Sequence, residues 1–108
     1  MPKQIISPFK RSGDLVFLSG MTGEPGDVRT QIINAFDKVK KALGEAGTSM
    51  ENVLSVTVYL ANLADRETGL NPLWENYFPV NPPARATLEV GLGPGRLVEI
   101  QVIAQMPK

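Results

Sequence analysis

The spacing of the apolar residues changes once between residues 28 and 60, and this change limits the folds that the chain can adopt. Apolar residues recur every three or four positions over 28–46, which predicts a helix with Asp27 as its N-cap and Gly47 just past its end. Over 53–60 apolar and polar residues alternate instead, which predicts a strand with one apolar face. That face is formed by Leu54, Val56, Val58 and Leu60. A long amphipathic helix next to a half-buried strand requires a domain that mixes α and β structure.

Strand patterns also occur before this helix. Residues 15–19 are a short, continuous apolar run after Gly13 and Asp14, which predicts a strand buried on both faces. Residues 20–27 are expected to form a loop. Residues 4–6 are a candidate for a further short strand at the start of the chain.

A second, shorter helix is predicted near residue 70. Asn71 and Pro72 suit its N-cap and first helical position, an irregular turn from Asp65 can extend it backwards, and Pro79 ends it. Its apolar residues are Leu70, Leu73, Trp74, Tyr77 and Phe78. Their helical spacing predicts that the three aromatic side chains pack in the core and do not form a stacking platform.

Residues 84–91 and 97–105 predict the last two strands. If Gly93, Pro94 and Gly95 form a hairpin loop between them, the two strands pair directly and their odd-numbered residues share a face. The residues on this odd face are then Arg85, Thr87, Glu89, Glu99 and Gln101. Helices can cover the even face, which is formed by Ala84, Ala86, Leu88, Val90, Val98, Ile100, Val102 and Ala104.

The order of these elements predicts a single α+β domain over residues 1–108. We expect a two-layer sandwich in which two helices cover one side of a mixed sheet. The other side is too apolar at Val53, Leu97 and Ile103 to lie open to water, yet too polar along the odd face for an ordinary core. We therefore expect another subunit to cover it.

Composition narrows the chemistry that such a domain can perform. The chain has no cysteine and no histidine, which excludes disulfides, thiolate nucleophiles, histidine-based triads and the usual zinc sites. Eleven basic residues balance eleven acidic ones, so no overall field attracts nucleic acid or an anionic membrane. No apolar run is long enough for a signal peptide or a membrane span, and a soluble, cytoplasmic protein is expected.

Arg85 and the glutamates of the odd face allow two interpretations. They can form a structural ion pair at a subunit boundary, which is the commoner use of such residues. Alternatively, the guanidinium grips the carboxylate of a small ligand with two hydrogen bonds while a glutamate orients a water molecule. The residue types alone leave both open.

Four segments resemble the RidA/YjgF family of reactive intermediate (imine/enamine) deaminases, formerly described as L-PSP endoribonucleases or translation inhibitors. They are "LVFLSGMTG", "NVLSVTVYLANLAD", "NPLWENYFPVNPPARATLEV" and "LVEIQVIAQ", in the family's order and spacing, and they extend from about residue 13 to the C-terminus. The pair "PPAR" and "VEI" is the most specific part. The resemblance implies a chorismate-mutase-like fold, homotrimers whose sheets close a central barrel, and active sites in the clefts between subunits.

The resemblance also implies roles for individual residues. Arg85 matches the arginine that holds the substrate carboxylate, and Glu99 matches the glutamate that positions the attacking water. The residues that match the rest of the site are Thr87, Ser19, Gly20 and Asn71. The implied reaction converts 2-imino or 2-enamino acids to 2-keto acids and ammonia, without a metal or cofactor.

Two segments differ from the family pattern: "SPFKRSGD" is shorter than the usual loop and has no tyrosine, and "MTG" follows "SG". Two other functions stay open. One is a trimer that binds small carboxylates without catalysis, and the other is the endoribonuclease or translation inhibitor of the older family names. Neutral net charge and the lack of histidine argue against the second, and nucleic acid is not an expected partner.

Overall fold

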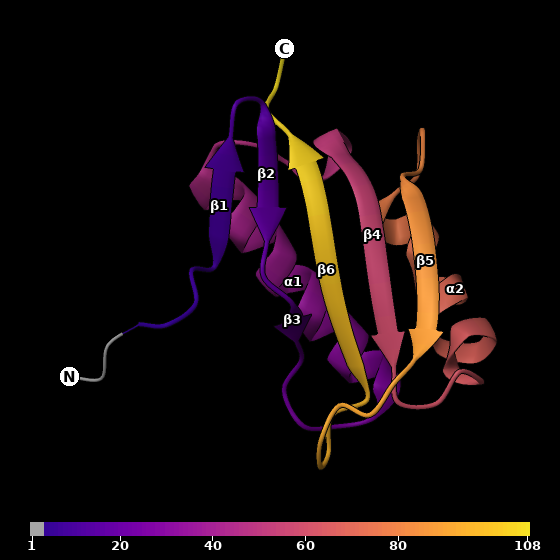
Figure 1. The fold of residues 1–108 in the computed structure, drawn as a ribbon. Helices are drawn as coiled ribbons and strands as arrows, with labels where there is room; N and C mark the ends of the chain where they lie inside the picture. The colour runs from indigo at the N-terminus through magenta and orange to yellow at the C-terminus, as the bar shows by residue number, and fades with distance from the viewer. Residues whose placement is uncertain (1–3) are drawn as a thin grey trace.

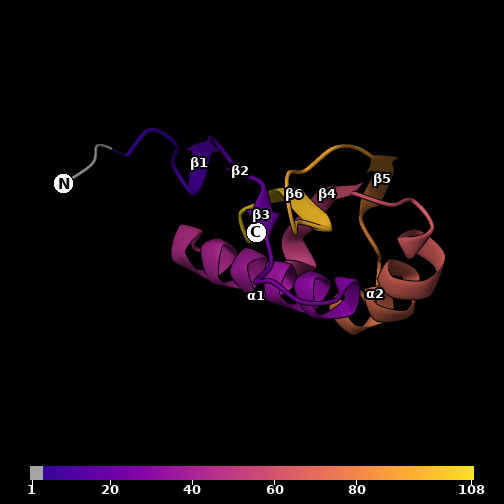
Figure 2. The ribbon, with the colours of Figure 1, turned by 90° about the horizontal axis from the view of Figure 1, so that it is seen from below.

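A computed structural model describes residues 4–108 as two layers, with both helices on one face of a six-stranded sheet (Figures 1 and 2). The strands are β1 (Phe9–Ser12), β2 (Leu15–Leu18), β3 (Met21–Thr22), β4 (Val53–Leu60), β5 (Ala84–Glu89) and β6 (Val98–Gln105). The helices are α1 (Val28–Ala46) and α2 (Asn71–Tyr77), with a 3₁₀ turn at Met50–Asn52 and a π-helical turn at Arg66–Leu70. The α+β class with a mixed sheet is confirmed.

Helix α1 has the predicted ends. The Asp27 side chain accepts a hydrogen bond of 2.8 Å from the backbone N–H of Thr30, and this bond lowers the pKa of the carboxyl group. Gly47 ends the helix in the left-handed conformation with φ of 92°, where a side chain would be strained. Local capping chemistry was therefore sufficient to locate this helix.

Helix α2 differs from the prediction at its start. Asn71 is not an N-cap, because the chain already follows the π-helical turn Arg66–Leu70 and Asn71 has helical backbone angles. The predicted extension back towards Asp65 is confirmed, as is the end of the helix before Pro79. Phe78 caps α2 through its N–H, which bonds to the carbonyl of Trp74.

The core lies between the two helices and the sheet. Its largest fully buried side chain is Phe36 of α1, which stacks on Tyr77 with a ring separation of 4.1 Å. The Trp74 and Phe78 rings are roughly perpendicular to the Phe36 ring, with centroid separations of 6.1 and 5.9 Å. This cluster fixes α2 against α1. Among residues 4–108, neither helix has the length and apolar character needed to cross a bilayer.

The N-terminal half of the sheet corrects three predictions. Residues 4–6 form no strand, and the first strand is Phe9–Ser12, which makes a hairpin with β2 around Gly13 and Asp14. Met21–Thr22 pairs with β6, so the predicted loop contains a short strand. Strand β2 is buried on one face only, because Leu15 and Phe17 are 38% and 39% exposed in the chain.

Strand β4 contains a β-bulge that the alternating pattern conceals. Val53 pairs with Ala104 and Ser55 with Ile103, so β4 uses two residues where β6 uses one. The extra residue reverses the alternation. Val53 is therefore buried on the helix side, whereas Leu54 is 40% exposed, and the predictions for both residues were wrong.

Strands β5 and β6 do not form the predicted hairpin. The sheet order is β1-β2-β6-β4-β5, so β4 lies between them (Figure 1). Strand β5 runs parallel to β4, as a β-α-β connection through α2 requires, and the chain then crosses the end of β4 to reach its other edge.

The loop that makes this crossing is held by one buried side chain. Gln31 of α1 is 1% exposed, and its amide donates to the carbonyls of Gly26 and Gly95 at 3.0 and 2.9 Å. Its oxygen accepts from the N–H of Leu97 at 2.8 Å. Every polar atom of this side chain is thus bonded, and the loop before β6 is tied to α1.

Candidate functional site

Arg85 and Glu99 lie on opposite faces of the sheet. Arg85 pairs with Val56 of β4, so it shares the face that the helices cover. Glu99 pairs with Tyr59, on the face that no helix covers. The prediction that they share a face was wrong, because it depended on direct pairing of β5 and β6. A structural ion pair between them within one chain is therefore excluded.

Arg85 is held at the edge of the sheet by residues of the helix layer. Its guanidinium carbon lies 4.7 Å from the centre of the Trp74 ring, within the range of a cation–π interaction. Partial burial, together with the nearby positive charge of Arg66, lowers the pKa of Arg85 from its usual value, while Glu67 opposes this shift. The guanidinium is half-buried and partly desolvated, which strengthens its attraction for an anion.

The other predicted residues near Arg85 are Thr87 and Asn71. Thr87 pairs with Val58 and is half-buried on the same side of the sheet as Arg85. The Asn71 amide lies 3.5 Å from a carboxylate oxygen of Glu67, which links it to the surroundings of Arg85. Glu89 is already used, because its carboxylate accepts a hydrogen bond of 2.9 Å from the N–H of Leu63.

Glu99 forms a second group with the turn after β2. A methyl group added at Gly20 would lie 2.5 Å from Oε2 of Glu99, so the carboxylate rests against the bare backbone of Gly20. The preceding residue, Ser19, is fixed by two bonds: its hydroxyl donates to the carbonyl of Ser7 at 2.6 Å, and its N–H to that of Pro8 at 3.0 Å.

The structure therefore divides the six predicted residues into two half-sites. We call Arg85, Thr87 and Asn71 the arginine half-site, and Ser19, Gly20 and Glu99 the glutamate half-site. Each half-site is assembled by one chain, but the two lie on different faces of the sheet. Within residues 4–108, no three acidic side chains gather closely enough to hold a metal ion.

Trp74 is the residue at the arginine half-site that sequence reasoning missed. It was predicted to be a core residue, and its ring contacts with Phe36 and Phe78, at 6.1 and 4.6 Å, agree with that. It is nevertheless half-buried and supports Arg85. The position of Trp74 in the helical pattern is the same whether it packs in the core or supports Arg85, so the pattern could not distinguish the two roles. Only the pairing of β5 with β4 reveals that Arg85 reaches α2.

Comparison with known proteins points to one family. Residues 4–106 match the family model described as Endoribonuclease L-PSP. The chain is 35% identical to Reactive Intermediate Deaminase A, chloroplastic, of Arabidopsis thaliana, over 89% of this chain and 56% of that protein. It is 28% identical to 3-aminoacrylate deaminase RutC of Acinetobacter baylyi, over 98% of this chain and 100% of that protein.

Solved structures agree with the sequence comparison. A member of the YjgF protein family from Neisseria meningitidis is 28% identical to the chain and superposes with a TM-score of 0.91. The superposition covers 99% of this chain and 92% of the other. The arrangement of strands and helices is thus shared along nearly the whole chain.

Proposed function

The chain belongs to the endoribonuclease L-PSP family, which includes the RidA and YjgF proteins, and we propose that it hydrolyses 2-imino and 2-enamino acids to 2-keto acids and ammonia. The observation that carries this proposal is its similarity to two proteins named as deaminases. One of them is named for 3-aminoacrylate, a compound that contains both an enamine and a carboxylate. A substrate of this type needs an anion-binding group and a placed water, which are the two functions that the half-sites can supply.

Two features support a site that is shared between copies of the chain. First, a substrate a few ångströms long cannot contact both faces of one sheet, so the arginine half-site of one copy must meet the glutamate half-site of another. Second, the uncovered face carries exposed apolar side chains, including Phe17 and Leu88 at 39% and 43% exposure, that a neighbouring copy can bury. We propose a homotrimer, in which the contact between different surfaces is repeated until a ring closes.

The reaction then follows from the two half-sites. Arg85 binds the substrate carboxylate with two parallel hydrogen bonds and fixes the position of C2. A 2-enamino acid first takes up a proton at C3 and becomes the imine. Glu99 of the neighbouring copy orients a water molecule and accepts a proton from it as the oxygen adds to C2 of the protonated imine. The resulting carbinolamine carries both a hydroxyl and an amino group. Glu99 returns its proton to the nitrogen, and the C–N bond then breaks and ammonia leaves. The hydroxyl gives its proton to Glu99 as it becomes the keto group, and Glu99 releases that proton to solvent.

The remaining residues act through position. Gly20 leaves room for the Glu99 carboxylate, and the bonds of Ser19 fix the backbone beside it. The Trp74 ring contacts the guanidinium of Arg85. An anion must therefore approach Arg85 from a side that Trp74 leaves free. Thr87 and Asn71 border the same half-site. Correct placement of water and carboxylate can provide much of the rate acceleration, since such substrates also hydrolyse unaided.

The proposal is tested by generating 2-iminopropanoate with an amino-acid oxidase and measuring how fast the imine disappears. Wild-type protein should accelerate its loss, and Arg85→Lys should fail nearly as badly as Arg85→Ala, because lysine cannot form the planar pair of hydrogen bonds. Arg29→Lys, on the exposed side of α1, is the matched control and should keep full activity. Binding of a 2-keto acid without any acceleration would indicate the non-catalytic function instead.

Glu99→Gln separates the role of the water from that of the carboxylate anchor. The change should lower kcat by about 10²- to 10⁴-fold, the usual value of general acid/base assistance, and should change product affinity much less. Glu45→Gln on α1 is the control for an exposed glutamate. Turnover that stays near normal in Glu99→Gln would assign Glu99 a structural role and remove the central step.

The family is described as an endoribonuclease, so RNA should also be tested as a substrate. Because the net charge is neutral, we expect that folded wild-type protein neither changes the gel mobility of RNA in a salt-dependent way nor cleaves it. If wild-type protein cleaves RNA and the Arg85 and Glu99 variants do not, the deaminase proposal would give way to an endoribonuclease function.

A further inference from the structure

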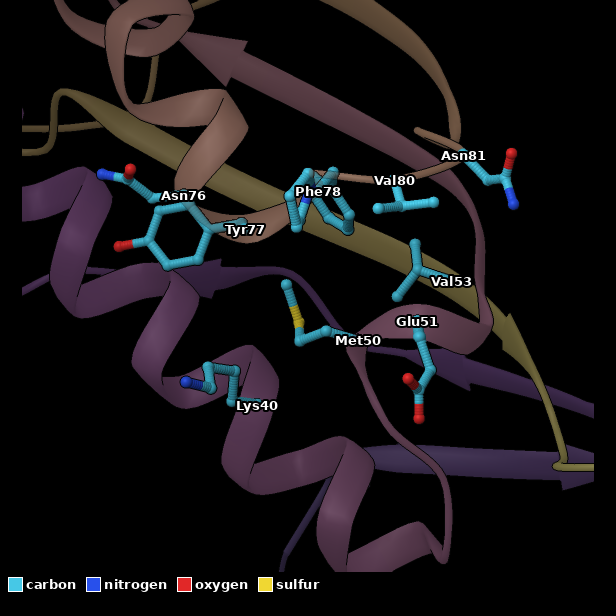
Figure 3. Close-up of a pocket in the computed structure, with 10 residues that line it drawn as sticks. Lys40, Met50, Glu51, Val53, Asn76, Tyr77, Phe78, Val80 and Asn81 are labelled. Carbon is cyan, nitrogen blue, oxygen red and sulfur yellow. The ribbon is translucent and has the colours of Figure 1, made fainter.

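A cavity of about 400 Å³ opens in the helix layer, and no residue of either half-site lines it. It lies between the C-terminal part of α1, the 3₁₀ turn Met50–Asn52, the start of β4 and the segment that follows α2 (Figure 3). This volume is within the range of pockets that hold small organic ligands. The cavity lies on the helix side of the sheet, whereas the glutamate half-site lies on the other face (Figure 2).

The middle of the cavity is apolar. Its floor is formed by Val53 and Phe78, which are only 7% and 6% exposed, and Met50 lies beside Phe78 (Figure 3). Val80 borders the same space and is 75% exposed. An apolar group placed there would remove water from Val80 and from Met50, and this burial is favourable.

Three hydrogen-bond donors lie together at one end. The polar ends of Lys40, Asn76 and Tyr77 are on one side of Met50 and Phe78, and Glu51 is on the other side (Figure 3). None of the three makes a side-chain hydrogen bond or ion pair with another residue of 4–108. Glu51, by contrast, already accepts a hydrogen bond of 3.1 Å from Ser49. The end of the cavity at Lys40 can therefore bind an acceptor group, and the charge available to attract it is that of Lys40.

Tyr77 remains a donor under ordinary conditions. Burial raises the pKa of its hydroxyl above the usual value of 10, and the nearby carboxylate of Asp37 acts in the same direction, while Arg29 opposes it. The hydroxyl therefore keeps its proton at neutral pH and can donate it to an anion.

We propose that this cavity binds a small carboxylic acid with an apolar body, at a site separate from the one proposed for catalysis. Lys40 and Tyr77 hold the carboxylate, and the body lies against Met50, Phe78 and Val80. An amine of the same shape is disfavoured, because it would place a positive charge beside Lys40. The occupant differs from a short imino acid in the length of its apolar part.

Three probes with the same six-carbon body test the charge preference: hexanoate, 1-hexanol and hexylamine. Each is titrated into isotope-labelled wild-type protein while backbone amide shifts are followed by NMR. Hexanoate should shift the amides of Met50, Val53 and Phe78 and reach saturation, whereas hexylamine should bind at least about tenfold more weakly, as expected for loss of a charge-assisted hydrogen bond.

Lys40→Gln supplies the matched test in the protein, with Lys41→Gln as its control. Lys41 is the next residue of α1, is exposed, and does not line the cavity. Lys40→Gln should weaken hexanoate binding about tenfold and leave 1-hexanol unchanged, while Lys41→Gln should alter neither. Both lysines are exposed, so loss of folding does not complicate the comparison.

Three results would overturn the proposal. One is the absence of saturable shifts around the cavity with hexanoate at tens of millimolar. Another is equal binding of hexanoate and hexylamine. The third is binding that disappears in Arg85→Ala, which would place hexanoate at the proposed catalytic site. Since Arg85→Ala should leave cavity binding unchanged, this proposal stands or falls independently of the deaminase activity.

Discussion

The two faces of the sheet are built from neighbouring residues of the same strands, yet they serve different purposes. On β6, Ile100 and Val102 are fully buried under the helices, while Glu99 and Gln101 point to the uncovered face. On β4, Val58 is fully buried, and Tyr59 beside it lies on the uncovered face and makes a long hydrogen bond of 3.4 Å to Gln101. One face is completed by its own chain and the other is not.

This difference suggests that one face of the sheet mainly determines stability and the other mainly determines function. The covered face supplies the core, so its residues should determine the free energy of unfolding. The uncovered face combines polar groups with exposed apolar ones and should determine assembly and chemistry. Arg85 is the exception, because it belongs to the covered face but lies at the edge strand, where α2 leaves it partly open.

The largest effect on stability is expected on β6, when a buried residue and its exposed neighbour are each replaced by alanine. Ile100→Ala should lower the free energy of unfolding by about 2–5 kcal/mol, because it leaves a cavity in the core. Gln101→Ala, one residue away, should change it by less than about 0.5 kcal/mol. Urea denaturation of both variants measures the contrast. Equal losses would mean that the uncovered face contributes to folding of the chain as much as the core does.

A smaller loss in the free energy of unfolding is expected at Gln31, the buried polar side chain that ties the loop before β6 to α1. Gln31→Leu keeps the size of the side chain but leaves the N–H of Leu97 and the carbonyls of Gly26 and Gly95 without their partner. The cost should be about 1–3 kcal/mol, with faster hydrogen exchange in the loop before β6. Gln31→Glu tests the same point, since it retains the acceptor for Leu97 and loses both donors. An unchanged loop in Gln31→Leu would show that the crossing from β5 to β6 holds without this anchor.

The smallest effect on stability should accompany a clear effect on activity. Gly20→Ala adds a methyl group against the flexible carboxylate of Glu99, so the carboxylate moves while the backbone stays. Imine hydrolysis should fall by about 10- to 100-fold, as a displacement of about 1 Å can cause. The melting temperature should hardly change. Gly44→Ala, where an added methyl meets nothing within 4 Å, is the control and should keep full activity. Loss of stability without loss of activity in Gly20→Ala would contradict the proposed role of the uncovered face.

Local patterns predicted the parts of the fold that depend on local chemistry. Helix α1 and its caps were located because Asp27 and Gly47 act on backbone groups a few residues away. Gly13 and Asp14 correctly marked the start of β2, but the polar run of β1 before them has no strand pattern, so the hairpin was not predicted.

Pairing over long distances could not be predicted in the same way. The loop with Gly93, Pro94 and Gly95 is compatible with a hairpin and with a longer crossing, and only the parallel alignment of β5 with β4 decides between them. That one choice moved Arg85 to the other face and joined it to Trp74. The bulge at Leu54 was hidden for a related reason, because Leu54 and Val53 are both apolar. The roles of the site residues came from resemblance and stay predictions.

Mixing two inactive variants tests most directly whether the site is shared between copies. Arg85→Ala keeps a complete glutamate half-site, and Glu99→Gln keeps a complete arginine half-site. If each site takes one half from each of two neighbouring copies, unfolding the variants together in equal amounts and refolding them should make about one site in four complete. Imine hydrolysis should then return to about a quarter of the wild-type rate, while each variant refolded alone stays inactive. A mixture that forms mixed assemblies and remains as inactive as its components would contradict the shared site.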